Sequence, residues 1–134
     1  MGLHCVSIII PVYNGAKTII ESLDSLLKQD YIGNNLNLVE IIVINDNSTD
    51  NSFVLVKDYF YDKTIKNIIL NNKKNLGLAA NYNIGIEISG GDYVITMHQD
   101  VILKNNALTL LVSAMDEVET VAAFHYVDHP REIW

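Results

Sequence analysis

Short apolar runs alternate along the chain with segments whose apolar residues have helical spacing. The first run, residues 6–12, is rich in β-branched residues and is followed by Asn14 and Gly15, which is typical of a buried strand that leads into a loop. Over residues 16–29 the apolar positions recur every three or four residues, which predicts a helix with Asn14 as its N-cap. Residues 31–37 are rich in asparagine and predict a turn.

The same alternation continues to the end of the chain. An aliphatic run at 39–44 predicts a strand that opens into the polar loop Asn-Asp-Asn-Ser. After Gly77 an apolar stripe predicts a helix that the glycine pair at 90–91 stops. The stripe of that helix is Ala80, Ile84 and Ile88, and a later helix has the buried face Leu108, Leu111, Met115 and Val118. The other predicted elements are a helix around 53–60 and strands at 65–70, 93–97 and 121–126.

Continuously apolar strands that alternate with helices favour parallel pairing, with helices on both faces of the sheet and right-handed connections. We therefore expect an open, mainly parallel α/β sheet of the Rossmann-like kind. No internal repeat or low-complexity linker divides the sequence, and its 134 residues suffice for one hydrophobic core but not for two. The prediction is a single domain over residues 1–134.

The acidic charge balance narrows the possible functions. The chain has 9 Lys or Arg and 16 Asp or Glu residues, and its net charge of -7 repels nucleic acid, which we do not expect as a partner. A ligand that carries phosphate would need a metal ion. The single cysteine, Cys5, cannot form an intrachain disulfide, so the cytoplasm is the expected compartment. The apolar runs are too short to predict a membrane segment, and no signal peptide is expected.

Polar residues follow three of the predicted strands. In an open α/β sheet, ligands bind beyond the carboxyl ends of the strands, at the point where the strand order reverses. Ordinary turns, helix caps and solvated carboxylates would explain each loop singly, but their common location at one edge favours a functional site. Neither a dinucleotide-binding nor a P-loop glycine motif is present to cradle phosphate. The three loops carry Tyr13-Asn14, Asn45-Asp46-Asn47 and His98-Gln99-Asp100.

Four motifs follow one another over about the first hundred residues. The first two are Val-Ser-Ile-Ile-Ile-Pro-Val-Tyr-Asn at 6–14 and Glu-Ile-Ile-Val-Ile-Asn-Asp-Asn-Ser-Thr-Asp at 40–50. The third motif is a pair of Asn-x-Gly blocks that begin at Asn75 and Asn83. The fourth is Gly-Asp-Tyr-Val followed by His-Gln-Asp at 98–100. In order and spacing, these motifs resemble those of family 2 glycosyltransferases with the GT-A fold. That fold fits the open α/β sheet expected above.

The resemblance implies where the base of a nucleotide-sugar donor binds. Pro11 and Tyr13 would line the base, and Asp46 would accept a hydrogen bond from a ring N–H. The imide of uracil suits an acceptor-only carboxylate, so a UDP-sugar is the favoured donor. Asn45 could hydrogen-bond the base or ribose, and Asn83 stands at the family position near the sugar and ribose. From the sequence alone, Tyr13 could equally cover a strand end, and Asn83 could be a helix cap or a surface residue.

The resemblance also implies a metal site. The last Asp of the family's Asp-x-Asp block corresponds to Asp100, which would ligate Mn²⁺ or Mg²⁺ while the ion bridges the two phosphates of the donor. His98 stands where that block has its first Asp, and it could ligate Mn²⁺ as a neutral imidazole or hydrogen-bond the donor's hydroxyls. Together with Gln99, these residues are expected to bind the nucleotide-sugar.

The chain departs from the family pattern in charge and in length. Asn45 and His98 replace acidic residues, and Tyr82 replaces an arginine that commonly precedes Asn83, which weakens the hold on the diphosphate. Family members have a second half after the Asp-x-Asp block that supplies the acceptor pocket and the general base. We therefore expect this chain to be the N-terminal, donor-binding portion of a longer enzyme, with an incomplete fold and the general base outside it.

The preferred hypothesis is a glycosyltransferase domain that binds a nucleotide-diphospho-sugar and a divalent metal, for inverting transfer to a saccharide or other hydroxyl acceptor. One alternative is a non-catalytic nucleotide-sugar-binding or interaction module that has lost the metal pair and the general base. A phosphoacceptor receiver domain is disfavoured because Tyr13 and Asn14, rather than acidic residues, follow the first strand. An uncovered sheet edge would favour a homodimer, and missing parts could hold the enzyme at a membrane surface.

Overall fold

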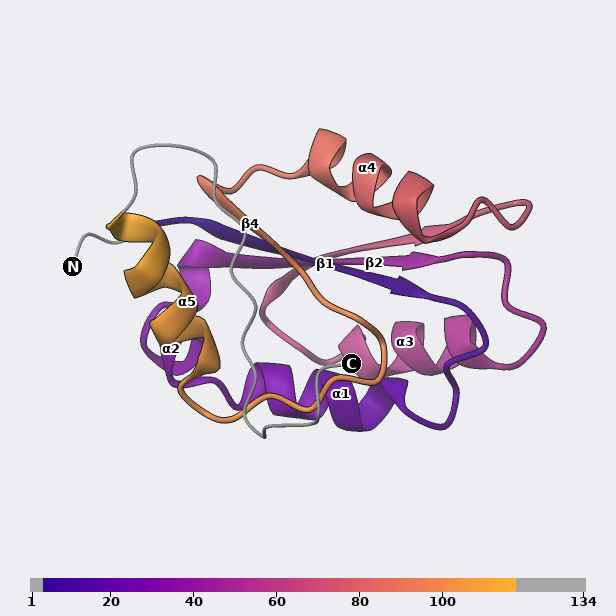
Figure 1. The fold of residues 1–134 in the computed structure, drawn as a ribbon. Helices are drawn as coiled ribbons and strands as arrows, with labels where there is room; N and C mark the ends of the chain where they lie inside the picture. The colour runs from indigo at the N-terminus through magenta and orange to yellow at the C-terminus, as the bar shows by residue number, and fades with distance from the viewer. Residues whose placement is uncertain (1–3, 118–134) are drawn as a thin grey trace, which may run out of the picture.

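A computed structural model describes residues 4–117, in which strands and helices alternate as the sequence predicts (Figure 1). The strands are β1 (Val6–Val12), β2 (Val39–Asn45), β3 (Lys66–Asn71) and β4 (Tyr93–Thr96). The helices are α1 (Ile19–Leu27), α2 (Asp30–Asn34), α3 (Ser52–Phe60), α4 (Leu78–Ile88) and α5 (Ala107–Asp116), with a 3₁₀ turn, η1, at Leu36–Leu38. No helix in this described part is long and apolar enough to cross a membrane.

The four strands form one parallel sheet in the order β3-β2-β1-β4. Val12 lies beside Asn45, and Asn45 lies beside Asn71, so the carboxyl ends of β1, β2 and β3 are level. The chain adds β2 and β3 on one side of β1 and then returns to add β4 on the other, so the strand order reverses between β1 and β4. The predicted open, parallel α/β sheet is confirmed.

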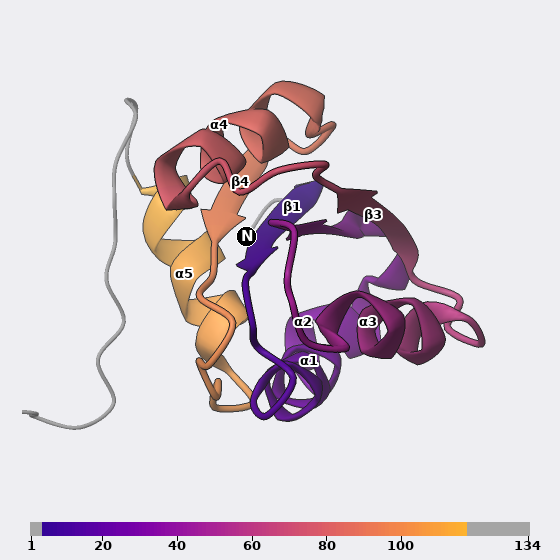
Figure 2. The ribbon, with the colours of Figure 1, turned by 90° about the vertical axis from the view of Figure 1, so that its right-hand side faces the viewer.

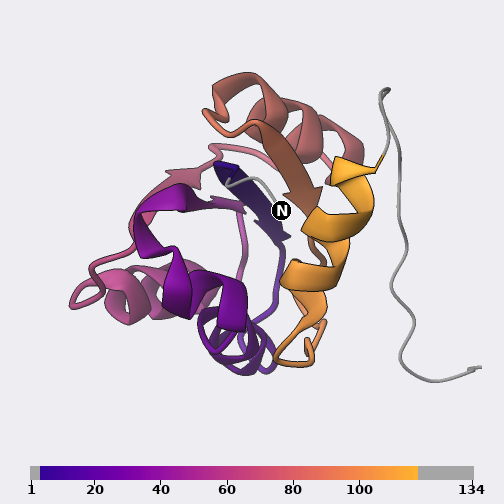
Figure 3. The ribbon, with the colours of Figure 1, turned by 90° about the vertical axis from the view of Figure 1, so that its left-hand side faces the viewer.

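Helices cover both faces of the sheet (Figures 2 and 3). Helices α1, α2, α3 and α5 pack on the face that carries Ile8 and Ile10. On the other face, α4 packs over Ile9, Ile42 and Ile44. Because β1 and β2 are covered on both sides, every residue of both strands is buried, which explains their continuous apolar runs.

The start of α1 differs from the prediction that Asn14 is its N-cap. The helix begins at Ile19, with Thr18 as its N-cap and no side-chain capping bond. A turn precedes it, since the carbonyl of Gly15 accepts from the N–H groups of Thr18 (3.0 Å) and Ile19 (2.9 Å). Asn14 has a φ of 47° and uses its side-chain oxygen to accept from Thr49 N (2.8 Å). It therefore binds the loop after β2 instead of capping a helix.

The region predicted as a turn at 31–37 is mostly helical. It contains α2 and η1, and α1 ends at Leu27, two residues earlier than predicted. Tyr31 and Ile32 are buried, and the Tyr31 hydroxyl donates to the carbonyl of His4 at 2.7 Å. These tertiary contacts outweigh the turn propensity of the glycine and the asparagines in this segment.

Helix α4 turns a different face to the sheet from the one its apolar stripe predicts. Asn81 and Gly85 are its fully buried residues, whereas Ile84 is half-buried and Ile88 is 40% exposed. The reason is steric, because a Cβ at Gly85 would lie 2.4 Å from Cγ2 of Ile9. The helix therefore approaches the sheet most closely at its glycine. It ends at Ile88, just before the glycine pair, as predicted.

The last described helix follows its predicted stripe only in part. Helix α5 buries Leu108 as predicted and Val112 with it, whereas Leu111 is half-buried. Met115 packs against the core from a partly buried position. Val118 and the predicted strand at 121–126 lie outside the described residues.

Candidate functional site

A cavity of about 300 Å³ lies at the carboxyl edge of the sheet, where the strand order reverses. Its walls come from the ends of β1, β2 and β4 and from the start of α4 with the loop before it. The lining residues are Pro11, Val12, Tyr13, Asp46, Asn75, Gly77, Leu78, Asn81, His98 and Gln99. The predicted site residues that the structure brings to this cavity are Pro11, Tyr13, Asp46, His98 and Gln99.

Asp46 lines the cavity although it is only 3% exposed. Its Oδ1 accepts hydrogen bonds from Leu76 N (2.8 Å) and Asn72 Nδ2 (2.9 Å), and its Oδ2 accepts one from Gly77 N (2.9 Å). Burial by itself raises the pKa of Asp46, but these hydrogen bonds outweigh it and hold the pKa below its usual value. The Asn81 side chain also lowers this pKa through a hydrogen bond, so Asp46 is an ionised acceptor at the wall of the cavity.

Asn81 is a lining residue that the predicted set lacks. It is 1% exposed, and its Oδ1 accepts from Asn72 Nδ2 at 2.7 Å. The Asn72 amide thus bridges Asp46 and Asn81, and it ties the loop before α4 to the first turns of that helix. The signal that could have found Asn81 is its spacing from Gly85, because residues four apart share one helix face and Gly85 marks the face that meets the sheet.

Tyr13 and Gln99 form a contact between the loops that follow β1 and β4. The Tyr13 side chain is 47% exposed, so its ring is available to a ligand. The Gln99 side-chain amide accepts from Tyr13 N (2.9 Å) and donates to Tyr13 O (3.1 Å). Both the oxygen and the nitrogen of the Gln99 amide are therefore hydrogen-bonded to the backbone of Tyr13.

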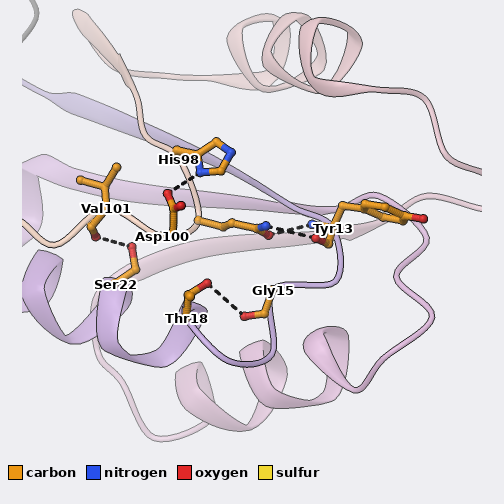
Figure 4. Close-up of polar contacts among 8 residues, drawn as sticks. Tyr13, Gly15, Thr18, Ser22, His98, Asp100 and Val101 are labelled. Atoms are coloured by element: carbon orange, nitrogen blue, oxygen red, sulfur yellow. Dashed lines mark hydrogen bonds and ion pairs between the residues drawn. The ribbon is translucent and has the colours of Figure 1, made fainter. Parts of the chain in front are cut away.

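His98 and Asp100 point toward each other beside this contact (Figure 4). His98 Nδ1 lies 2.5 Å from Asp100 Oδ1, and the two side chains are 48% and 58% exposed. The segment is anchored to α1, because the Ser22 hydroxyl donates to the carbonyl of Val101 at 2.7 Å. His98 lines the cavity, whereas Asp100, two residues further along the chain, does not.

The His98 and Asp100 pair fits part of a metal site. Within residues 4–117, no three His, Cys, Asp or Glu side chains converge on one point, so protein side chains alone would not enclose a cation there. Ions such as Mg²⁺ are commonly held by one or two carboxylates with substrate phosphates and water supplying the rest. With Nδ1 of His98 directed at the Asp100 carboxylate, Nε2 is the ring nitrogen left for a metal. The pair is therefore suited to a cation that a diphosphate helps to hold.

Besides Asp100, two more predicted site residues lie outside the cavity lining. Asn45 is 3% exposed, and its amide joins Asn71 Oδ1 (2.8 Å) to the Ser48 hydroxyl (2.6 Å), so it ties the ends of β2 and β3 together. Asn83 is exposed on α4, about 200° around the helix from Asn81. Their proposed contacts with base, ribose or sugar stay predictions.

The loops after β1 and β2 are cross-linked behind the cavity. Asp50 accepts from Ala16 N (3.1 Å) and from the Ser52 hydroxyl (2.5 Å), and the same hydroxyl accepts from Gly15 N (2.9 Å). Burial tends to raise the pKa of Asp50, but its hydrogen bonds to Ser52 and Ala16 hold that pKa below the usual value. The walls that carry Tyr13 and Asp46 are therefore held by local hydrogen bonds without a ligand.

An open parallel sheet with a cavity at its switch point is the arrangement of a Rossmann-like nucleotide-binding protein. Solved glycosyltransferase structures share the fold. The structure of a mannosyltransferase from Pyrobaculum calidifontis in complex with GDP-Man and Mn²⁺ matches 96% of this chain and 37% of its own, with a TM-score of 0.84 at 24% identity. Staphylococcus aureus TarS 1–349 in complex with UDP matches 84% of this chain and 32% of its own, with a TM-score of 0.73 at 27% identity. The fold is the GT-A fold, as predicted.

Sequence comparison identifies the family. The chain belongs to glycosyl transferase family 2, whose sequence model matches residues 7–134. An uncharacterized glycosyltransferase of Rickettsia bellii is 38% identical over 112 residues, which cover 84% of this chain and 15% of that protein. Glycosyltransferase GlyG of Streptococcus pneumoniae is 31% identical over 112 residues, which cover 84% of this chain and 35% of that protein. The chain thus spans between 15% and 35% of the length of these two relatives.

Proposed function

We propose that this chain is the donor-binding part of a glycosyltransferase that transfers a sugar from a nucleoside diphosphate to an acceptor hydroxyl with inversion. The observation that carries the proposal is the convergence of Tyr13, Asp46 and His98 on one cavity at the switch point of the sheet. These residues offer an aromatic surface, an ionised acceptor and a metal-ligating nitrogen, which are the groups that a nucleotide-sugar with a cation requires.

We propose uridine as the nucleoside that the cavity takes. The exposed ring of Tyr13 would stack on the base, and the ionised Asp46 carboxylate at the cavity wall would accept from the imide N–H of uracil. The solved structures of similar proteins do not decide the identity of the nucleobase, because one contains UDP and another contains GDP-Man. A comparison of nucleotides is therefore part of the test.

His98 and Asp100 would hold a divalent cation together with the diphosphate of the donor. When bound, Mn²⁺ or Mg²⁺ supplies positive charge that neutralises the leaving diphosphate. In this proposal Asp100 contributes an oxygen ligand and orients the His98 ring through the bond to Nδ1. The imidazole favours Mn²⁺ over Mg²⁺, since Mg²⁺ prefers oxygen ligands.

The base that deprotonates the acceptor is proposed to lie in the part of the relatives' length that this chain does not span. Among the lining residues of the described chain, Asp46 is the one carboxylate. Its hydrogen bonds hold its pKa below the usual value, which makes it a poor proton acceptor. In this proposal Asp46 organises the cavity and binds the nucleobase of the donor.

A non-catalytic nucleotide-sugar-binding module is the second candidate. It is favoured by one observation: His98 stands in place of an acidic residue and already pairs with Asp100. Such a module would bind a nucleotide with little dependence on metal. Two further expectations, a cytoplasmic location and association of two copies through an uncovered sheet edge, stay predictions; a monomeric mass by light scattering would count against the second.

Isothermal titration calorimetry with UDP, GDP, CDP and dTDP, each with and without Mn²⁺, tests the proposed function. We expect UDP to bind most tightly, and Mn²⁺ to strengthen binding in the unmodified chain but not in Asp100→Ala. The matched control is Asp62→Ala, which removes an exposed carboxylate that pairs with the adjacent Lys63. Equal UDP affinity with and without Mn²⁺ would favour the non-catalytic module. No binding of any nucleotide by the folded chain would overturn the proposal.

A further inference from the structure

Gln99 joins the loop that carries Tyr13 to the segment that carries His98 and Asp100. Its Oε1 accepts from Tyr13 N (2.9 Å), and its Nε2 donates to Tyr13 O (3.1 Å), as the dashed lines at Tyr13 in Figure 4 show. The side-chain amide thus pairs with both backbone groups of one residue, as a directly opposite residue of an antiparallel strand does.

Backbone pairing between β1 and β4 ends before it reaches this point. The register stops at Ile9 beside Thr96, and Met97 N then donates to Ile9 O at 2.9 Å. Alternate residues of a strand direct their backbone groups to the same neighbour, so Pro11 and Tyr13 follow Ile9 on the β4 side. Pro11 has no N–H to extend the ladder. The Gln99 amide restores the connection at the next residue on that side, Tyr13.

Gly15 provides the space for this contact. A Cβ at Gly15 would lie 2.4 Å from Oε1 and 2.9 Å from Cδ of Gln99. The backbone of Gly15 is not in the left-handed region, so space for the Gln99 amide, rather than conformational freedom, requires glycine here. The pairing of Gln99 with Tyr13 therefore depends on a second, independent residue that can be changed.

We infer that Gln99 is a positioning residue for the nucleoside: it holds the Tyr13 loop at the distance and orientation in which the ring meets the base, and it ties that loop to the His98 and Asp100 segment. This inference rests on the proposed function and replaces direct donor contact as the role of Gln99. Both ends of the Gln99 amide hydrogen-bond Tyr13. Loss of the amide should therefore weaken nucleobase binding through a change in the position of Tyr13.

Uridine is the probe that isolates this effect, because it has the base and ribose but no phosphate that could reach a cation. We expect Gln99→Met to weaken uridine binding about tenfold, as loss of two backbone hydrogen bonds predicts. Gln99→Glu keeps the acceptor for Tyr13 N but loses the donor to Tyr13 O, so its affinity should be intermediate. Gly15→Ala should weaken uridine binding as Gln99→Met does, because it displaces the amide.

The matched control is Gln29→Met, the same chemical change at a glutamine remote from the cavity. Gln29 donates to Ser25 O (3.1 Å) and Lys104 O (2.6 Å) and accepts from Leu108 N (3.0 Å). Its replacement should lower the free energy of unfolding and leave the affinity of the folded chain for uridine unchanged. A purely structural role of Gln99 would give the same pattern as Gln29, so the contrast between the two variants separates positioning from stability.

The outcomes distinguish failure of the inference from failure of the proposed function. Normal uridine affinity in Gln99→Met, with UDP and Mn²⁺ still bound by the unmodified chain, overturns the inference alone. If the unmodified chain binds neither uridine nor UDP, the proposed function and the inference both fail. If Gln99→Met does not fold, Gln99→Glu and Gly15→Ala carry the measurement, and normal uridine affinity in both overturns the inference.

Discussion

The two halves of the cavity differ in how far their polar groups are already satisfied. On the side of β2 and α4, Asp46 is buried and holds three hydrogen bonds from the loop before α4. On the side of β4, His98 and Asp100 are about half exposed and bind mainly each other. The first half is prebuilt in the folded chain, whereas the second half keeps exposed polar groups that a ligand would complete under the proposed function. A substitution in the first half should therefore act on stability, and one in the second half on ligand binding.

The largest expected effect comes from Asp46→Ala. The change leaves the N–H groups of Leu76 and Gly77 without their acceptor and removes one of the two acceptors of the Asn72 amide. We expect a loss of about 3 kcal/mol in the free energy of unfolding, measured by urea titration, because these donors bind a charged, buried acceptor. A loss below about 1 kcal/mol would contradict the distinction between the two halves.

Gly85→Ala tests the close approach of α4 that supports the same half. The new Cβ would lie 2.4 Å from Ile9 Cγ2, so we expect a cost of about 2 kcal/mol in thermal or urea unfolding. Gly33→Ala is the control, because nothing lies within 4 Å of a Cβ at that position in α2. It should be neutral or slightly stabilising. Equal effects of the two changes would show that α4 can move away from the sheet without cost.

The pH dependence of stability should also report on Asp46. Its pKa is lower in the folded chain than in the unfolded chain, so its stabilising effect is present above the ordinary pKa of an aspartate and is lost as pH falls through the lower, folded value. We therefore expect urea unfolding below pH 4 to show a loss of stability that Asp46→Asn reduces. An identical acid dependence in both proteins would mean that other carboxylates, such as Asp50, dominate it.

The smallest effect on stability is expected for Asp100→Ala. It removes one partner of an exposed His98 pair, and exposed ion pairs contribute roughly 0.2 to 1 kcal/mol at most. Thermal unfolding without ligand should therefore be nearly unchanged, while the strengthening of UDP binding by Mn²⁺ is lost. A large loss of stability in Asp100→Ala would place this residue with the prebuilt half of the cavity.

Much of the fold could be predicted because its signals are local. The apolar runs at 6–12 and 39–44 are continuous because both faces of β1 and β2 are covered, and this pattern also implies parallel pairing. The strand ends that carry Tyr13, Asp46 and His98 then meet at one edge by topology alone. The positions of these site residues therefore follow from strand assignment, without knowledge of side-chain contacts.

The details that could not be predicted depend on contacts between distant segments. Asparagine is common at helix N-caps, but the side chain of Asn14 accepts a hydrogen bond from Thr49 on another loop. Asn81 rather than Asn83 faces the cavity, because the fit of Gly85 against the sheet fixes the rotation of α4. The bonding of Gln99 to Tyr13 is likewise invisible in sequence, since it replaces a backbone ladder that ends several residues earlier.

The position of β4 in the sheet has a consequence for the order of folding. The pairs β1–β2 and β2–β3 join strands that are consecutive in the chain. Tyr13, by contrast, meets Gln99 across a sequence separation of 86 residues. Closing so long a loop is entropically costly, so the sheet edge that carries the cavity should be among the last parts to assemble. A nucleotide that needs both loops then recognises only the finished fold. It should slow unfolding and leave the refolding rate unchanged.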